Sequence, residues 1–237
     1  MTRTAHLFAL TLGLLAAVLA PAAMAKDTAD TDGWVVAAKA RSPSDISLWT
    51  RTVPGAQLKS FRGATHLEAG MESMVAFLYD ASLMKDWLFR CKEARILEER
   101  PDATYVYIRI KGIWPLEDRD AVVKVVPEFV AATGEIRLRG TAAPDFLPKQ
   151  EGHIRIPAIE STWLMRPAGQ GQIYVEWWGH VDPAGNVPRW LSNSIATLIP
   201  RYTIRQVREQ ITADHWKTPA VLDTGSKLLE RIRQTPR

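Results

Sequence analysis

The chain has 237 residues, a formal net charge of +4, 46% hydrophobic residues and one cysteine. This length allows one large domain with its own core, and the lone Cys91 excludes an internal disulfide. Arg and Lys are scattered among Asp and Glu rather than clustered, which argues against a nucleic-acid binder and supports at most a weak attraction to anionic membrane surfaces.

The first 25 residues have the pattern of a secretory signal peptide. Arg3 supplies a short positive start, an apolar run covers residues 7–20, and Ala23-Met24-Ala25 fits a cleavage site. The run is shorter than the roughly 20 residues of a membrane-spanning helix, so an uncleaved anchor is the less favoured alternative. We expect cleavage near Lys26 and an exported protein, periplasmic or secreted.

Apolar periodicity predicts the next elements. A short helix is expected over residues 33–41, followed by two strands over 44–53 and 58–67 that turn at Pro54-Gly55. Apolar residues then recur at intervals of three and four over residues 68–89, which is helical spacing.

Alternating apolar and polar residues predict the remaining strands. Four are expected over 94–99, 105–111, 120–130 and 134–140, and a last hairpin is expected over 153–165 and 172–181. This alternation is typical of an antiparallel sheet with one buried face. A proline-containing loop separates the two groups at residues 141–152.

A long amphipathic helix is predicted at residues 188–211, with a kink at Pro200. We assign residues 26–212 to one domain and residues 213–237 to a C-terminal extension with a further helix at 226–233. The element order predicts an α+β fold in which a curved antiparallel sheet is covered by the long helix. Patterning alone does not separate this fold from other antiparallel sheets capped by a helix.

Motifs of common enzyme classes are absent from the sequence. It has no G-x-S-x-G, H-E-x-x-H, C-x-x-C, P-loop or G-x-G-x-x-G pattern, so we expect no metal and no cofactor. The candidates for acid–base chemistry are Arg109, Glu160, Glu176 and His180. Strand alternation favours an outward, solvated position for them.

Two signatures carry the most specific information: Ile113–Asp120 (IWPLEDRD) and Asp182–Asn193 (DPAGNVPRWLSN). Together they resemble the START (StAR-related lipid-transfer) family. Weaker similarities follow in the same order at Pro54–Gly63 (PGAQLKSFRG) and at Leu83–Trp87 (LMKDW) with Cys91–Ala94 (CKEA). The resemblance extends from about residue 33 to residue 211.

The resemblance implies a helix-grip fold, similar to START and Bet v 1 proteins, with a lipid cavity between the sheet and the C-terminal helix. The side chains expected to line it are Val106, Ile108, Ile110, Val123, Val125, Leu138, Ile154, Ile156, Val175, Trp177, Leu191, Ile195 and Leu198. Trp114, with Phe146 and Leu147, is expected at the cavity mouth in contact with membrane. The alternatives are a Trp114 that plugs the sheet edge and an interior filled by side chains.

Sterol-binding animal members of the family place an acidic residue and an arginine in the cavity. The matching positions here are Arg109 and Val125, so the resemblance does not imply a sterol and leaves other lipids open.

We therefore expect a non-enzymatic, monomeric lipid carrier that contacts membranes transiently and binds no nucleic acid. One alternative is a cyclase-like or hydrolase-like enzyme on the same scaffold, acting on an apolar substrate. The other is an interaction module with a solid core.

Overall fold

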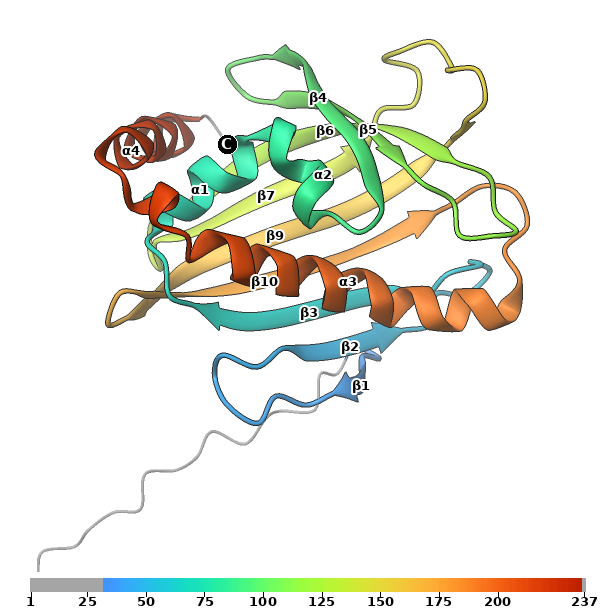
Figure 1. Ribbon diagram of the computed structural model, residues 1–237, viewed down its shortest axis with the longest axis horizontal. Helices are drawn as coiled ribbons and strands as arrows, with labels where there is room; N and C mark the ends of the chain where they lie inside the picture. The colour runs from blue at the N-terminus through green and yellow to red at the C-terminus, as the bar shows by residue number, and fades with distance from the viewer. Residues whose placement is uncertain (1–31, 236–237) are drawn as a thin grey trace, which may run out of the picture. The chain divides into compact units, whose positions relative to one another are not determined.

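A ten-stranded sheet is the framework of the computed structural model, which describes residues 32–235 (Figure 1). The strand order is β1-β2-β3-β10-β9-β7-β6-β5-β4, with β8 beside β6. Neighbouring strands are antiparallel, apart from the short parallel pair of β6 and β8. The predicted signal peptide, residues 1–25, lies outside the described residues.

The strands are β1 (Val35–Ala38), β2 (Ser47–Arg51), β3 (Ser60–Leu67), β4 (Cys91–Glu99), β5 (Thr104–Ile110), β6 (Arg119–Val130), β7 (Glu135–Ala142), β8 (Ile154–Arg155), β9 (Ala158–Gly169) and β10 (Gln172–Asp182). The helices are α1 (Met71–Tyr79), η1 (Ala81–Leu83), α2 (Met84–Trp87), α3 (Arg189–Ile211), η2 (Asp214–Lys217) and α4 (Pro219–Gln234). Within residues 32–235, no helix is both long enough and apolar enough to cross a membrane.

The long helix α3 runs across one face of the curved sheet, and α1 and α2 lie on the same side (Figure 1). The predicted α+β fold is therefore confirmed. Helix α3 packs closely on β3 at Gly63, where an added Cβ would lie 2.4 Å from Ile204 Cδ1 and 3.2 Å from Pro200 Cβ. Only a residue without a side chain allows this approach.

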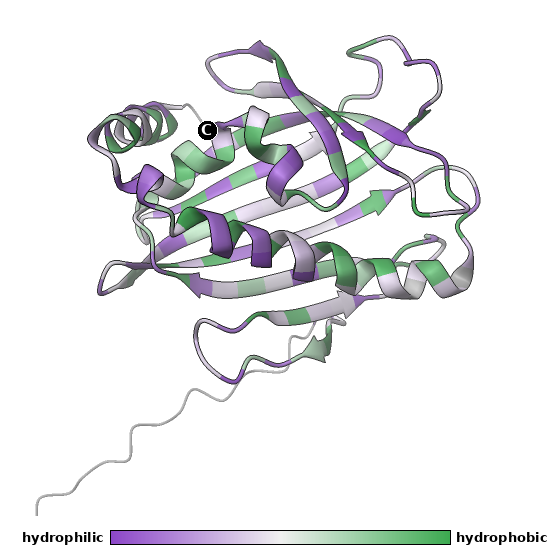
Figure 2. Cartoon of the chain, viewed as in Figure 1, coloured by the Kyte–Doolittle hydropathy of each residue, from purple (hydrophilic) through white to green (hydrophobic). Residues whose placement is uncertain are grey.

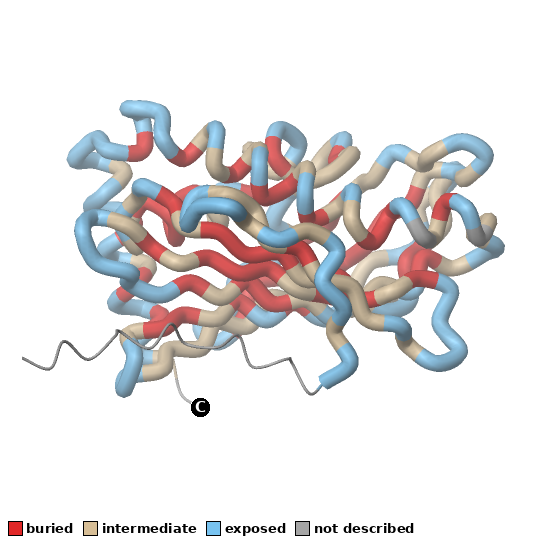
Figure 3. Tube along the Cα trace, turned by 90° about the horizontal axis from the view of Figure 1, so that it is seen from below, coloured by how far each residue is buried: buried red, intermediate tan, exposed pale blue. Residues whose placement is uncertain are grey.

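The main core lies between the sheet and the helices, and buried segments follow the central strands in Figure 3. Trp163 and Trp177, opposite each other on β9 and β10, stack with ring centroids 5.0 Å apart. Phe61 meets Trp177 edge-on at 4.6 Å, and Trp87 meets Trp163 edge-on at 6.0 Å. Much of the tryptophan content is thus used to build one aromatic cluster under the helices.

The N-terminal segment corrects one prediction. Residues 33–41 were expected to be helical, but Val35–Ala38 forms strand β1 against β2. Val35 and Val36 are both exposed, so the segment has no apolar face that a packed helix could bury. Pairing with the edge of β2 satisfies backbone groups instead, and β-branched residues favour that state.

The C-terminal residues pack against α1. Trp216 of η2 and Leu229 and Ile232 of α4 are buried members of the main core cluster. An added Cβ on Gly225 would lie 2.1 Å from the backbone oxygen of Glu72, so α4 and α1 are in backbone contact there. Helix α4 is longer than the predicted helix at 226–233. It begins with Pro219, and proline is well suited to the first helical position because an N–H there would have no partner within the helix.

Candidate functional site

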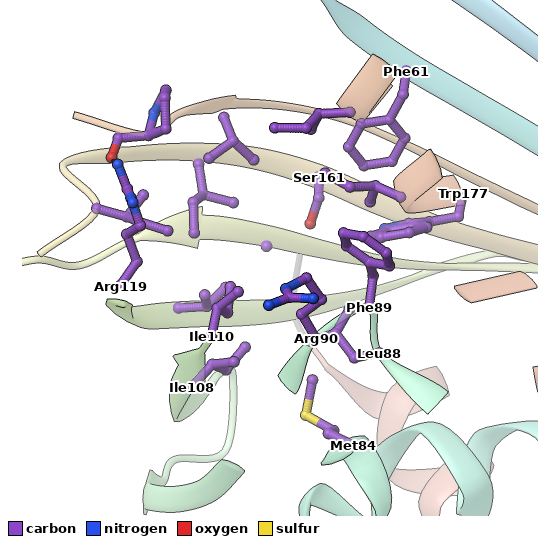
Figure 4. Close-up of a pocket in the computed structure, with 18 of the residues that line it drawn as sticks. Phe61, Met84, Leu88, Phe89, Arg90, Ile108, Ile110, Arg119, Ser161 and Trp177 are labelled. Carbon is purple, nitrogen blue, oxygen red and sulfur yellow. The ribbon is translucent and has the colours of Figure 1, made fainter. Parts of the chain in front are cut away.

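A cavity of about 270 Å³ lies between the sheet, α2 and α3 (Figure 4). Its walls come mainly from inward side chains of β5, β6, β7, β9 and β10, from the α2–β4 connection and from α3. Almost all of these side chains are apolar, and its volume is slightly below the roughly 300–1,000 Å³ of typical ligand pockets. The arrangement provides a water-poor space suited to an apolar molecule.

Most of the predicted lining residues surround this cavity. They are Val106, Ile108, Ile110, Val123, Val125, Leu138, Ile156, Trp177 and Ile195. On the strands, period-2 alternation selects them, because residues that share a face of a sheet are two apart.

Four expected lining residues lie elsewhere. Val175 points inward but is buried in the main core beside the cavity, and Leu191 packs with Leu58 and Ile195 in a separate cluster. Leu198 is 43% exposed, because it lies off the helix ridge formed by Ile195 and Ile199. Ile154 is half-buried in the short strand β8.

Sequence reasoning missed several lining residues that belong to connections. They include Leu58, Leu88, Phe89, Arg90, Lys111, Ile113, Leu116 and Pro183. Short connections have no repeating pattern from which an inward side could be deduced. Some of these residues do fall inside the START-like signatures, which was the one available signal.

The β5–β6 loop, residues 111–118, is held in place by charged side chains. Asp118 accepts the Gly112 N–H at 2.8 Å and a bond from Lys92 Nζ at 2.9 Å. The Lys92 bond, with that from Gly112, holds the pKa of Asp118 below its ordinary value. An added Cβ on Gly112 would lie 2.1 Å from Leu116 O, so a side chain there would break the loop.

Two arginines also hold the β5–β6 loop in place, through hydrogen bonds to its backbone carbonyls. Arg90 adopts a left-handed backbone with φ of 57° and donates to Lys111 O at 2.9 Å and to Gly112 O at 2.6 Å. Arg119, only 6% exposed, donates to Glu117 O and, at 3.5 Å, to Pro183 O of the second signature. The first signature is therefore joined to the second at the cavity wall.

The second signature is also tied to the β2–β3 connection. The Gln57 side chain donates to Gly185 O at 2.6 Å and accepts from the Val187 N–H at 2.9 Å. This pair of bonds sets where the chain enters α3 and explains why the PGAQ segment accompanies the two signatures.

Trp114 is at the surface of this loop. Its side chain is 85% exposed, so it does not plug the sheet edge as core. Its neighbours Ile113 and Leu116 line the cavity and pack against Leu191 and Ile195 of α3. The contact between the loop and the first turns of α3 is therefore part of the cavity wall.

Phe146 and Leu147 were expected at the cavity mouth, but they lie on the other face of the sheet, away from the cavity. Phe146 stacks on Tyr105 with centroids 4.0 Å apart, in a small cluster with Tyr107 and Val122. Val122 alternates with the cavity-lining Val123, so this cluster covers the outer face. Arg155 holds the loop there by donating to the carbonyls of Pro144 and Leu147.

The acid–base candidates also face away from the cavity. Glu176 accepts from Arg62 at 2.9 Å and from Tyr174 at 2.7 Å, and Arg109 pairs with Glu93 at 3.3 Å. His180 is opposite Glu160 in the β9–β10 ladder, in the same outward register as Glu176. None of the four candidates lines the cavity.

A family model for the START domain matches residues 15–208. An uncharacterised protein of Pseudomonas aeruginosa is 29% identical over 169 residues, which cover 71% of this chain and 83% of that protein.

Solved structures agree with this match. A fragment of a STAR-related lipid transfer protein from Xanthomonas axonopodis is 30% identical, with a TM-score of 0.69, over 77% of this chain and 100% of that chain. Human STARD10, at 18% identity and a TM-score of 0.68 over 86% of this chain and 83% of that one, shares the fold. The signatures, the sheet with its long helix and the family model agree: the chain belongs to the START domain family.

Proposed function

We propose that this protein is an exported, monomeric carrier that binds a lipid-like molecule in its cavity and moves it between membranes. The observation that supports this most directly is the cavity itself, which has almost entirely apolar walls in a START chain. The name of its Xanthomonas relative, a STAR-related lipid transfer protein, agrees with such a role. Export rests on the signal-peptide pattern of residues 1–25.

Burial of hydrocarbon supplies the binding free energy. Each Å² of apolar surface removed from water contributes about 25 cal/mol, so a ligand with roughly 400 Å² of hydrocarbon surface gains on the order of 10 kcal/mol. Ordering of the ligand and its lost translational freedom offset part of this gain. The apolar cavity therefore supplies a driving force for binding that needs no covalent step.

We infer that the ligand enters between the β5–β6 loop and the first turns of α3. This contact consists of a few apolar side chains, chiefly Ile113, Leu116, Leu191 and Ile195, and the first half of α3 is the more hydrophobic half in Figure 2. Trp114 lies beside this contact and is exposed. An exposed tryptophan suits the membrane interface, because its ring is apolar and its N–H tolerates water.

A matched pair of substitutions on β6 tests the cavity as the binding site. Val125 lines the cavity, whereas its neighbour Val126 packs on the outer face. Val125→Phe should fill part of the cavity and lower the uptake of radiolabelled palmitate or phospholipid from vesicles at least tenfold. Val126→Phe, folded to the same extent by circular dichroism, should leave uptake close to wild type. Equal uptake by both variants would place the ligand outside this cavity.

A further inference from the structure

The geometry points to an anionic head group on the ligand, a carboxylate or a phosphate, held by Arg119 at the end of the cavity nearest the β5–β6 loop, with Arg90 as a second cation further along the cavity wall. This inference rests on the proposed carrier function and narrows its ligand class. The apolar tail would then extend towards Trp163 and Trp177.

The charges that line the cavity all have one sign. Its lining residues include Arg90, Arg119 and the exposed Lys111, and no Asp or Glu is among them. Arg90 and Arg119 both donate hydrogen bonds to the β5–β6 loop, Arg90 to Gly112 O and Arg119 to Glu117 O. Gly112 itself lies against the backbone of Glu117, so both arginines bind the same part of the loop, while Figure 4 shows their side chains at separate places along the cavity.

The hydrogen bonds of both arginines leave their charge unbalanced. Every bond that Arg90 and Arg119 donate within the described residues goes to a backbone carbonyl, and neither forms an ion pair there. Arg90 Nη1 and Arg119 Nη2 have no hydrogen-bond partner in that part of the chain. A guanidinium carries five N–H donors in a planar fork, so each has donors left for a carboxylate or phosphate.

Arg155 provides a comparison within the same molecule. It is as buried as Arg119, at 7% against 6% exposure, but it forms a two-bond pair with Asp120 on the outer face. That pair raises the pKa of Arg155, whereas burial lowers the pKa of Arg119 despite the nearby Glu117 and Asp118. The protein thus pairs its outer buried arginine and leaves the one in the cavity wall without a counter-ion.

The nearby carboxylates do not fill this role. Asp118 is bound by Lys92 and by the Gly112 N–H, and Glu117 is exposed and is not among the cavity-lining residues. A buried cation without an anion costs several kcal/mol. A ligand anion at this position would remove that cost, and a neutral head would not.

Ser161 adds a neutral donor to the same cavity. Its side chain is directed into the cavity in Figure 4, and its hydroxyl makes no hydrogen bond within the described residues. A free hydroxyl in the cavity wall is a further donor for an oxygen-rich ligand.

Matched pairs of single-chain probes test the inference with the full protein. Palmitate is compared with hexadecanol, and lysophosphatidic acid with monoacylglycerol, by isothermal titration below the aggregation concentration of each probe. We expect each anionic probe to bind at least tenfold more tightly than its neutral partner. The pair with the larger ratio identifies a carboxylate or a phosphate as the head.

Variants assign the effect to these side chains. Arg90→Gln should reduce the anionic-to-neutral affinity ratio at least threefold, and Arg119→Gln, checked for folding by circular dichroism, should reduce it further. Lys149→Gln, an equal charge change in the exposed 141–152 loop, should leave the ratio unchanged.

Two negative results are distinguishable. Neutral and anionic probes that bind equally well would overturn the head-group inference while the carrier function stands. The absence of binding by every probe would overturn the carrier function itself.

Discussion

The buried ion pair between Arg155 and Asp120 allows a quantitative prediction. Arg155 Nε and Nη2 donate to the two carboxylate oxygens of Asp120 at 2.9 and 2.8 Å. The same guanidinium donates to the carbonyls of Pro144, Leu147 and, at 3.1 Å, Pro148. This one side chain therefore holds the 141–152 loop on the outer face, and with it Phe146.

Substitution of Arg155 by Met keeps the apolar stem and removes every donor. Asp120, which is fully buried, then loses its counter-ion, and the loop carbonyls lose their partner. Breaking a buried pair from one side costs about 3–5 kcal/mol. For a protein of this size, that corresponds to a drop in Tm of about 6–20 °C.

The assay is urea unfolding followed by tryptophan fluorescence and circular dichroism, with Arg139→Met as the control. Arg139 pairs with Glu128 at 2.9 Å, but both side chains are largely open to solvent, so the control should lose about 0–1 kcal/mol. Palmitate uptake by folded Arg155→Met should match wild type, because the loop faces away from the cavity. A loss of stability no larger than that of the control would refute the reasoning.

Three further predictions concern other parts of the molecule. Burial raises the pKa of Cys91 to about 11, above the value near 9 of an exposed thiol, so the folded state holds this proton more tightly. That contribution to stability is complete below about pH 9 and is lost as the pH rises towards 11. The free energy of unfolding should therefore fall more steeply between pH 9 and 11 in wild type than in Cys91→Ala. Equal slopes in the two proteins would contradict this. Gly225→Ala gains about 1 kcal/mol of helix propensity, but its Cβ would clash with the Glu72 backbone. The clash should dominate, so urea unfolding should show a loss of at least 1 kcal/mol. The control Ser226→Ala, at an exposed position of the same helix, should change stability by less than about 0.5 kcal/mol. Trp114→Ala should slow lipid transfer between vesicles severalfold with Tm unchanged, while Val36→Ala, another exposed apolar truncation, should not; equal rates would exclude the membrane role of Trp114.

The strands were predictable because a sheet with one buried face imposes a period of two. That period placed Val123 and Val125 inward and Lys124 outward on β6, as the structure has them. Segment 33–41 is too short to show either period clearly, so tertiary pairing with β2 decided its structure.

The site was less predictable, because its decisive residues act over long sequence distances. The face on which Phe146 lies depends on Arg155 and on Asp120, which is 35 residues away from Arg155. Arg90 lines the cavity from a connection, where its own backbone is left-handed and no repeating pattern indicates an inward side chain. Local patterns specify faces of elements, and contacts between connections complete the cavity.

The most direct test of the central claim is mass spectrometry of the protein purified from its native host under non-denaturing conditions, followed by analysis of its organic extract. The carrier function predicts about one lipid-like molecule per chain, present in wild type and reduced in Val125→Phe. An empty extract, together with no uptake of lipid from vesicles, would contradict the claim that this cavity carries a ligand.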